Sequence, residues 1–215
     1  MIYRCILPQW VLEEFPDRKR VREGEFSLDE IEELNANYYN IYYLPNYPSS
    51  YDSNETVDGS HIDTFEYVFV DMDLKEGKHA SKESFLEIIN GFALTPSRIV
   101  DSGNGIHVYW RTTDLDAISF LRLQRRLTRL FTTDEAVSKI YQLMRVPGSI
   151  NTKDKDDFKL CQTIFESEAK YSCEDLDKAL PIITGEDEKY CQMHYDKTYN
   201  RDVSSKDVVT TIPAK

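Results

Sequence analysis

Cysteine is scarce in this 215-residue sequence, and a long hydrophobic run is missing. The four cysteines are far apart and form no Cys-x-x-Cys pair, so reduced thiols and a cytoplasmic location are expected. No apolar stretch reaches the roughly 20 residues of a membrane-spanning helix. Residues 1–10 lack the small-residue cleavage site of a signal sequence, so we expect no export and no membrane partner.

Positive charge is also in short supply, because 26 Lys and Arg stand against 38 Asp and Glu and give a formal net charge of -12. Such a balance argues against binding a polyanion with the whole surface. The charge is unevenly distributed, however, since residues 98–153 hold nine basic and five acidic side chains. The middle of the chain is therefore where anion binding is expected.

Apolar residues make up 40% of the sequence, enough to bury the core of one α/β domain. Helical and strand periodicities predict an α+β fold with a mainly antiparallel sheet and flanking helices. From Thr184 onward the sequence is polar and weakly patterned, so we place one folded domain at 1–183 and a polar tail or linker at 184–215. The predicted helices are 28–38, 81–92, 115–131 (capped by Asp114) and 174–180, and the predicted strands are 40–44, 65–70, 98–100, 106–110 and 158–165.

Two carboxylates end the most apolar predicted strand. Side chains alternate along a strand, so Asp71 and Asp73 project to one face. Two carboxylates side by side repel each other unless a cation lies between them, and hard oxygen ligands suit Mg²⁺ or Mn²⁺. The alternative is a pair of solvated acids at a strand end.

Two further motifs carry groups that suit phosphates. The turn at residues 101–105 contains two glycines, which allow a ligand to approach the backbone closely, and His107 follows on the next strand. Arg145 and Lys153 flank a Pro-Gly turn and offer a planar fork and a point charge. The alternatives are a plain hairpin with a core histidine and a surface turn between two cations.

The order and spacing of these motifs resemble the archaeo-eukaryotic primase superfamily, over about residues 35–180. Asp71-Met72-Asp73 matches the Asp-x-Asp motif of that family, and Ser102 to His107 is similar to its small-x-His motif in the form common among phage- and plasmid-type members. Residues 134–137, followed by 143–153, are similar to its third acidic region. Asp134 is the candidate third acid, and Asp101 is its weaker rival.

The resemblance implies an RRM-like catalytic core with an N-terminal α/β unit beside it. It implies a DNA primase or primase-polymerase, a nucleotidyltransferase that uses two Mg²⁺ or Mn²⁺ ions to add NTPs or dNTPs to a 3′-hydroxyl on a single-stranded DNA template. Related proteins often fuse this core to a helicase, so a helicase domain or subunit is a further expected partner. The implied metal ligands are Asp71, Asp73 and Asp134, and the implied nucleotide-binding residues are Ser102, Gly103, Asn104, His107, Arg145 and Lys153, with His107 also assigned to catalysis.

Several alternatives remain open from the sequence. A non-catalytic module that binds single-stranded nucleic acid could use the same RRM-like scaffold, and another Asp-x-Asp transferase would not need the turn motifs. Four arginines at helical spacing (122, 125, 126 and 129) either contact template phosphates or form a solvated face that neutralises acids, and we favour the second. Tyrosines 38–43 either stack bases or, as we favour, pack in the core, and Cys161, Cys173, Cys191 and His194 fit no compact zinc finger.

Overall fold

We describe a computed structural model of the chain, in which residues 1–52 and 55–200 are described. The helices are α1 (Gln9–Glu14), α2 (Leu28–Ala36), α3 (Lys82–Asn90), α4 (Ala117–Leu130), α5 (Cys173–Ala179) and α6 (Gly185–Tyr199), with short 3-10 turns η1 (Gly59–His61), η2 (Leu74–Glu76) and η3 (Glu135–Val137). The strands are β1 (Tyr3–Ile6), β2 (Val21–Gly24), β3 (Asn40–Tyr43), β4 (Phe65–Asp73), β5 (Arg98–Asp101), β6 (Gly105–Leu115), β7 (Met144–Arg145), β8 (Ile150–Asn151), β9 (Lys159–Leu160), β10 (Gln162–Glu166) and β11 (Lys170–Tyr171).

The larger sheet is built around β6, which lies at its centre. Strand β4 pairs antiparallel with one edge of β6, and β5 (antiparallel) and the short β11 (parallel) pair with the other edge. Strand β10 continues the sheet beyond β5. The predicted α+β fold with a mainly antiparallel sheet is therefore confirmed. Strand β6 is long and apolar because it is buried at the centre of the sheet, and the apolar side chains of β4 are buried where it packs against β6 and α4.

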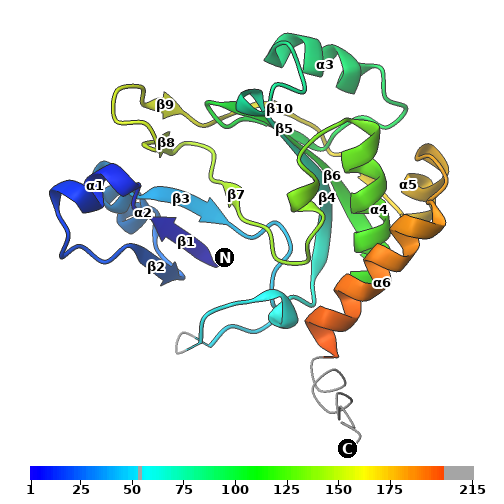
Figure 1. Cartoon of the computed structure of the whole chain (residues 1–215), viewed down its shortest axis with the longest axis horizontal. Helices are drawn as coiled ribbons and strands as arrows, with labels where there is room; N and C mark the ends of the chain where they lie inside the picture. The colour runs from blue at the N-terminus through cyan, green and yellow to red at the C-terminus, as the bar shows by residue number, and fades with distance from the viewer. Residues whose placement is uncertain (53–54, 201–215) are drawn as a thin grey trace, which may run out of the picture.

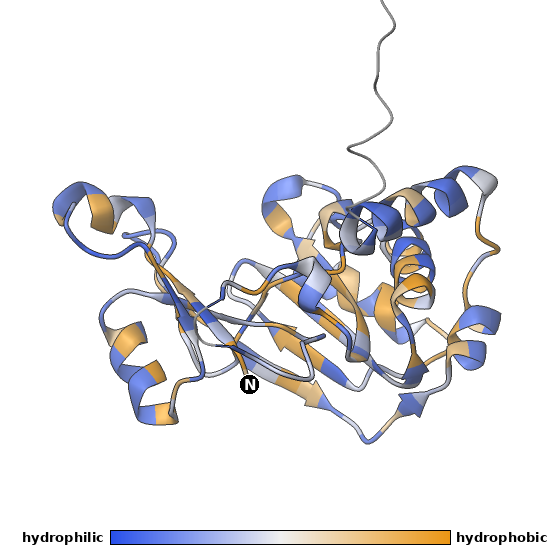
Figure 2. Cartoon of the chain, turned by 90° about the horizontal axis from the view of Figure 1, so that it is seen from below, coloured by the Kyte–Doolittle hydropathy of each residue, from blue (hydrophilic) through white to orange (hydrophobic). Residues whose placement is uncertain are grey.

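Helix α4 covers this sheet and joins it to the C-terminal helices (Figure 1). Its apolar side packs into the core through Phe120, Leu123 and Leu127. Its Gln124 is fully buried and hydrogen-bonds the backbone of Phe69 on β4 through both its oxygen and its nitrogen. Figure 2 shows hydrophobic residues along the strands of the central sheet and mixed colours along the helices, as expected for helices with one buried side.

A second, smaller sheet lies beside the first and has the order β2-β1-β3-β7. Helices α1 and α2 pack against it around a separate core that includes Val11, Ile31 and Ile41 (Figure 1). Strand β7 comes from the region after α4, so residues more than 100 positions apart in the chain meet in this sheet. This unit is the predicted N-terminal α/β unit, although β1, α1 and β2 had not been predicted as elements.

Two predicted boundaries are wrong. Strand β6 runs on to Leu115, so Asp116 rather than Asp114 caps α4, with its carboxylate accepting a hydrogen bond from the Ser119 amide at 2.8 Å. The single strand predicted at 158–165 is divided into β9, which pairs with β8, and β10, which pairs with β5. The bonds from Cys161 to the turn at residues 148–149 separate the two strands.

The segment predicted as a polar tail contains a folded helix between residues 185 and 199. Helix α6 packs on α4, and its Asp187 and Cys191 are buried. The hydrophobic pattern missed this helix because one of its two buried residues is Asp187, which is ion-paired with Arg125 and Arg129. The remainder of the predicted tail, residues 201–215, lies outside the described residues. Within the described part of the chain, no helix is both long and apolar enough to cross a membrane.

Candidate active site

Strand pairing brings the first two motifs together. In the β4–β6 register, Asp71 lies opposite His107 and Asp73 lies opposite Gly105. The Nε2 atom of His107 is 3.6 Å from the Oδ1 atom of Asp71. Gly105 cannot be replaced without a backbone shift, because a Cβ atom there would lie 1.9 Å from the carbonyl oxygen of Met72.

The turn between β5 and β6 is fixed from two sides. Lys82 of α3 contacts the Asp101 carboxylate at 2.6 Å and the Gly103 carbonyl at 2.9 Å, while Asp101 also accepts the Gly103 amide. On the other side, Lys159 of β9 donates to the Asn104 side chain at 2.9 Å. Gly103 has a φ of 92°, a conformation that favours glycine. Asp101 is thus committed to this turn, which argues against its role as the rival third acid.

Arg145 reaches the same region from β7 and is held rigidly. Its Nη1 donates to the Asn40 side chain at 2.7 Å, and its Nη2 donates to the Tyr42 hydroxyl at 3.0 Å. The guanidinium also lies over the Tyr42 ring, with its central carbon 4.8 Å from the ring centroid. These partners leave Arg145 buried yet still bordering the site.

These side chains border one pocket of about 160 Å³. Most of the residues that the sequence suggested for the site line it. Gly103 and Asp134 do not. Tyr42, Gly105, Leu143 and Asn151 also line it, although none of them had been assigned a role. Leu143 and Asn151 belong to the 143–153 segment of the third motif, and Gly105 belongs to the glycine turn. Tyr42 has no motif around it and is brought to the pocket by the pairing of β3 with β7. The predicted residues that line the pocket are Asp71, Asp73, Ser102, Asn104, His107, Arg145 and Lys153.

Asp134 lies next to the pocket rather than in its wall. Its amide donates to the Asp71 carbonyl at 3.3 Å, so the turn that carries it is attached to the end of β4. One carboxylate oxygen caps η3 through the Ala136 amide. Within the described ranges, no three His, Cys, Asp or Glu side chains form a group arranged to hold a metal ion, and this applies both to the acids here and to the candidate zinc residues.

Burial and the charges of neighbouring groups shift the pKa values of two pocket residues, Asp71 and His107. Burial, and to a smaller extent the nearby charges of Asp73 and Asp134, together raise the pKa of Asp71 from 3.8 to about 7. Burial lowers the pKa of His107 from 6.5 to about 3, with Arg145 adding to the effect, so this imidazole is neutral at pH 7. The pocket therefore holds a carboxylate cluster that a cation would stabilise.

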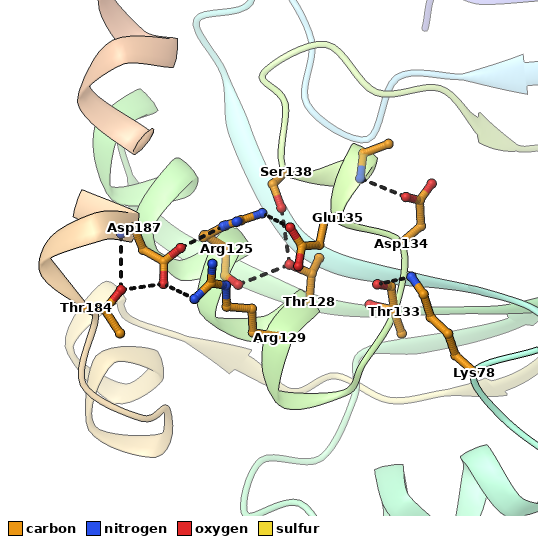
Figure 3. Close-up of polar contacts among 11 residues, drawn as sticks. Lys78, Arg125, Thr128, Arg129, Thr133, Asp134, Glu135, Ser138, Thr184 and Asp187 are labelled. Atoms are coloured by element: carbon orange, nitrogen blue, oxygen red, sulfur yellow. Dashed lines mark hydrogen bonds and ion pairs between the residues drawn. The ribbon is translucent and has the colours of Figure 1, made fainter. Parts of the chain in front are cut away.

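The arginine stripe of α4 points away from this pocket and contacts acids. Arg125 pairs with Glu135 at 2.5 Å and with Asp187 of α6 at 2.9 Å, and Arg129 pairs with Asp187 at 2.7 Å. Figure 3 shows this chain of contacts running from α6 to the turn that carries Asp134. The stripe neutralises acids as favoured, but the prediction of a solvated face is wrong for Arg125, which is buried, as is Arg126 beside it.

The tyrosines of residues 38–43 differ in burial. Tyr39 and Tyr43 are buried in the core, as favoured, and Tyr42 borders the pocket. Tyr38 keeps 38% of its surface exposed. The four cysteines are free thiols, of which Cys173 is partly buried and the others are buried.

Among known proteins, this chain matches solved structures but no family model and no curated protein sequence. Among solved structures, the chain is similar to the archaeo-eukaryotic primase domain of the cyanophage S-2L primase-polymerase, with a TM-score of 0.67 and 17% identity over 84% of this chain and 88% of that one. The fold is therefore that of an archaeo-eukaryotic primase core.

Two structures of the primase RepB′ are also similar. One gives a TM-score of 0.56 and 12% identity over 96% of this chain, which spans 63% of the length of that one. The other, a catalytic domain in complex with initiator DNA, gives a TM-score of 0.51 and 11% identity over 94% of this chain and 90% of that one. At these identities the likeness concerns the fold.

Proposed function

We propose that the protein is a template-dependent nucleotidyltransferase of the primase-polymerase type, which adds NTPs or dNTPs to a 3′-hydroxyl on single-stranded DNA. One observation carries the proposal: a single pocket joins the Asp71 and Asp73 carboxylates to the glycine turn, His107, Arg145 and Lys153. Carboxylates opposite cations and a close-approach backbone suit a metal-bound triphosphate. The likeness to primase structures, one of which contains initiator DNA, supports the same conclusion.

The donor set fits divalent ions. Asp71 and Asp73 supply oxygen ligands, and Asp134 is close enough for its charge to raise the pKa of Asp71. Carboxylates of this kind favour Mg²⁺ or Mn²⁺, and Asp134, whose turn is attached to the end of β4, is the candidate for a third ligand. When bound, two such ions activate the attacking hydroxyl and stabilise the departing pyrophosphate.

The other side chains would bind and orient the nucleotide. Lys153 and the rigid Arg145 would offset triphosphate charge, which grows on the leaving pyrophosphate. The glycine turn that begins at Ser102 would let phosphate oxygens approach the backbone. His107 is neutral at pH 7, so it would act as a hydrogen-bond donor rather than as a cation.

A primer-extension assay tests the proposal. Wild-type protein with single-stranded template, labelled NTPs or dNTPs, and Mg²⁺ or Mn²⁺ should incorporate label, and Asp71→Ala/Asp73→Ala should abolish incorporation. The matched control is Asp154→Ala/Asp156→Ala, which removes another Asp-x-Asp pair from an exposed loop outside the pocket. Equal incorporation by the wild type and the 71/73 variant refutes the proposal.

The same assay separates the alternative, a non-catalytic module that binds single-stranded nucleic acid. The observation that favours this alternative is that, among the residues described, no three His, Cys, Asp or Glu side chains are arranged to bind a metal ion. It predicts template binding that needs no divalent ion and no turnover with any nucleotide, and the 71/73 variant would then bind at least as tightly because two repelling charges are gone.

A further inference from the structure

Three aromatic rings from distant parts of the chain meet at the edge of the N-terminal unit. Trp10 of α1, Tyr38 after α2 and Phe158 before β9 have ring centroids 5.1 to 6.2 Å apart. Phe158 keeps 45% and Tyr38 38% of its surface exposed. We call these three residues the aromatic platform. In Figure 1, α1 and the β8–β9 hairpin that the platform connects lie next to each other.

The backbone at Tyr38 indicates that its ring has a role beyond ending the helix. Tyr38 follows the last turn of α2 with a φ of 69°, where glycine is the usual residue. The amide of Tyr39 bonds back to the Leu34 carbonyl at 3.0 Å, which is the usual bond of such a helix end. A bulky side chain in this conformation is strained, and such strain is concentrated at functional sites.

The platform and the candidate active site share strand β8 and the residues that follow it. Side chains alternate there: Asn151 and Lys153 line the catalytic pocket, while Ile150 and Thr152 line a hollow against Tyr38 and Phe158. The platform is thus on the other side of one narrow strand from the pocket. A strand of nucleic acid that leaves the pocket across this edge would pass the platform.

The hollow has the size and chemistry for a flat ring. Its volume is about 320 Å³, and mostly apolar atoms line it. Two of its polar side chains already have partners: Thr152 donates to the Tyr38 carbonyl at 2.6 Å, and Asn35 bonds both the amide and the carbonyl of Ile150. Glu32 is a third polar side chain of the hollow. Because the lining atoms are mostly apolar, we expect stacking, which every base permits, to dominate recognition.

We propose that the aromatic platform binds an unpaired nucleobase of the single-stranded template beside the catalytic pocket. This inference rests on the proposed function, which requires a single-stranded template. Exposed aromatic rings next to a site that handles nucleotides suit an unpaired base, because each base presents a π-face for stacking. Base stacking holds the strand in register without sequence preference.

The charges around the platform set a further expectation. Residues 151–160 contain Lys153, Lys155 and Lys159 but also three aspartates, and Lys155 and Lys159 pair with Glu14 and Asp157. This surface therefore neutralises few phosphates. The salt dependence of binding follows the number of neutralised phosphates. We therefore expect the contribution of the platform to the free energy of DNA binding to change little between about 50 and 200 mM salt.

Tryptophan fluorescence tests the proposal on the full chain. The chain has two tryptophans, and Trp110 is fully buried while Trp10 is partly exposed. Titration with oligo(dT) should quench Trp10, and an abasic oligonucleotide of the same length should not. Phe158→Ala should weaken oligo(dT) binding about tenfold or more. Tyr38→Gly should weaken it similarly while relieving the backbone strain, and both variants should keep the circular dichroism of the wild type.

The control is Phe15→Ala, which removes another exposed ring from the end of α1 and should leave binding unchanged. Equal quenching by abasic and normal oligonucleotides, or unchanged affinity of Phe158→Ala, overturns the proposal. So does a Phe158→Ala effect on self-association in sedimentation without an effect on DNA binding, which would make the platform a contact between two copies. If base-dependent quenching occurs in a protein that incorporates no nucleotide, the platform stands and the polymerase function fails.

Discussion

Replacing Asp71 by Asn should stabilise the metal-free protein at alkaline pH while abolishing its proposed activity. In the folded chain the pKa of Asp71 is raised from 3.8 to about 7, mainly by burial. A raised carboxyl pKa means that the folded state binds a proton more tightly than the unfolded state. The free energy of unfolding therefore falls as pH rises from about 4 to about 7, and the full cost is present above pH 7.

The difference between 3.8 and about 7 sets an upper limit of about 4 kcal/mol, at about 1.4 kcal/mol per pH unit. The Asp71 side chain is 30% exposed, so solvent screens part of this cost, and a gain of roughly 1–2 kcal/mol is the reasonable expectation. For a chain of this size that gain raises the melting temperature by roughly 2–8 °C. Asn keeps the shape of the side chain and removes its charge.

The assay is thermal denaturation in the presence of EDTA at pH 5 and pH 8. Asp71→Asn should melt at a higher temperature than the wild type at pH 8 and close to it at pH 5, and Mg²⁺ or Mn²⁺ should stabilise the wild type more than the variant. Asp17→Asn, at an exposed position in a turn, is the charge-matched control. An equal difference at both pH values, or a less stable variant at pH 8, would refute the reasoning.

Three further predictions concern neighbouring groups. Lys82→Met should raise KM for the nucleotide about tenfold with a smaller change in kcat, as measured by steady-state kinetics. The reason is that it removes the contacts of Lys82 with the Asp101 carboxylate and the Gly103 carbonyl, which hold the turn in place. Arg125→Met should lower the free energy of unfolding by about 3 kcal/mol in urea denaturation, because it leaves the buried Asp187 with one cation fewer. The His107 ring signals, assigned with His107→Gln, should not titrate between pH 5 and 8 in NMR spectra, because the pKa of this residue in the folded chain is lowered to about 3. The unfolded chain binds the proton first, so this group lowers the free energy of unfolding as pH falls from about 6.5 to about 3.

The sequence predicted most elements whose signals are local. Ser27 caps α2 with a capping box directly before the helix predicted at residues 28–38, and β4 ends in the expected acid pair. Such signals come from capping and side-chain alternation, which depend on a few adjacent residues. Where the local signal was ambiguous, at Asp114 and Asp116, the boundary was set by how far β6 pairs with β4, a contact with a strand some 50 residues earlier.

The candidate site shows the same division. The sequence by itself determined the chemical inventory: paired carboxylates, a glycine turn with a histidine, and two cations. Only the tertiary structure decided that Asp71 lies opposite His107, that Asn40 and Tyr42 hold Arg145 from 105 and 103 residues away, and that Asp101 belongs to the turn. It also made α6 part of the fold through Asp187. The physical reason is that strand register and buried ion pairs are fixed by packing between distant segments, which no local pattern records.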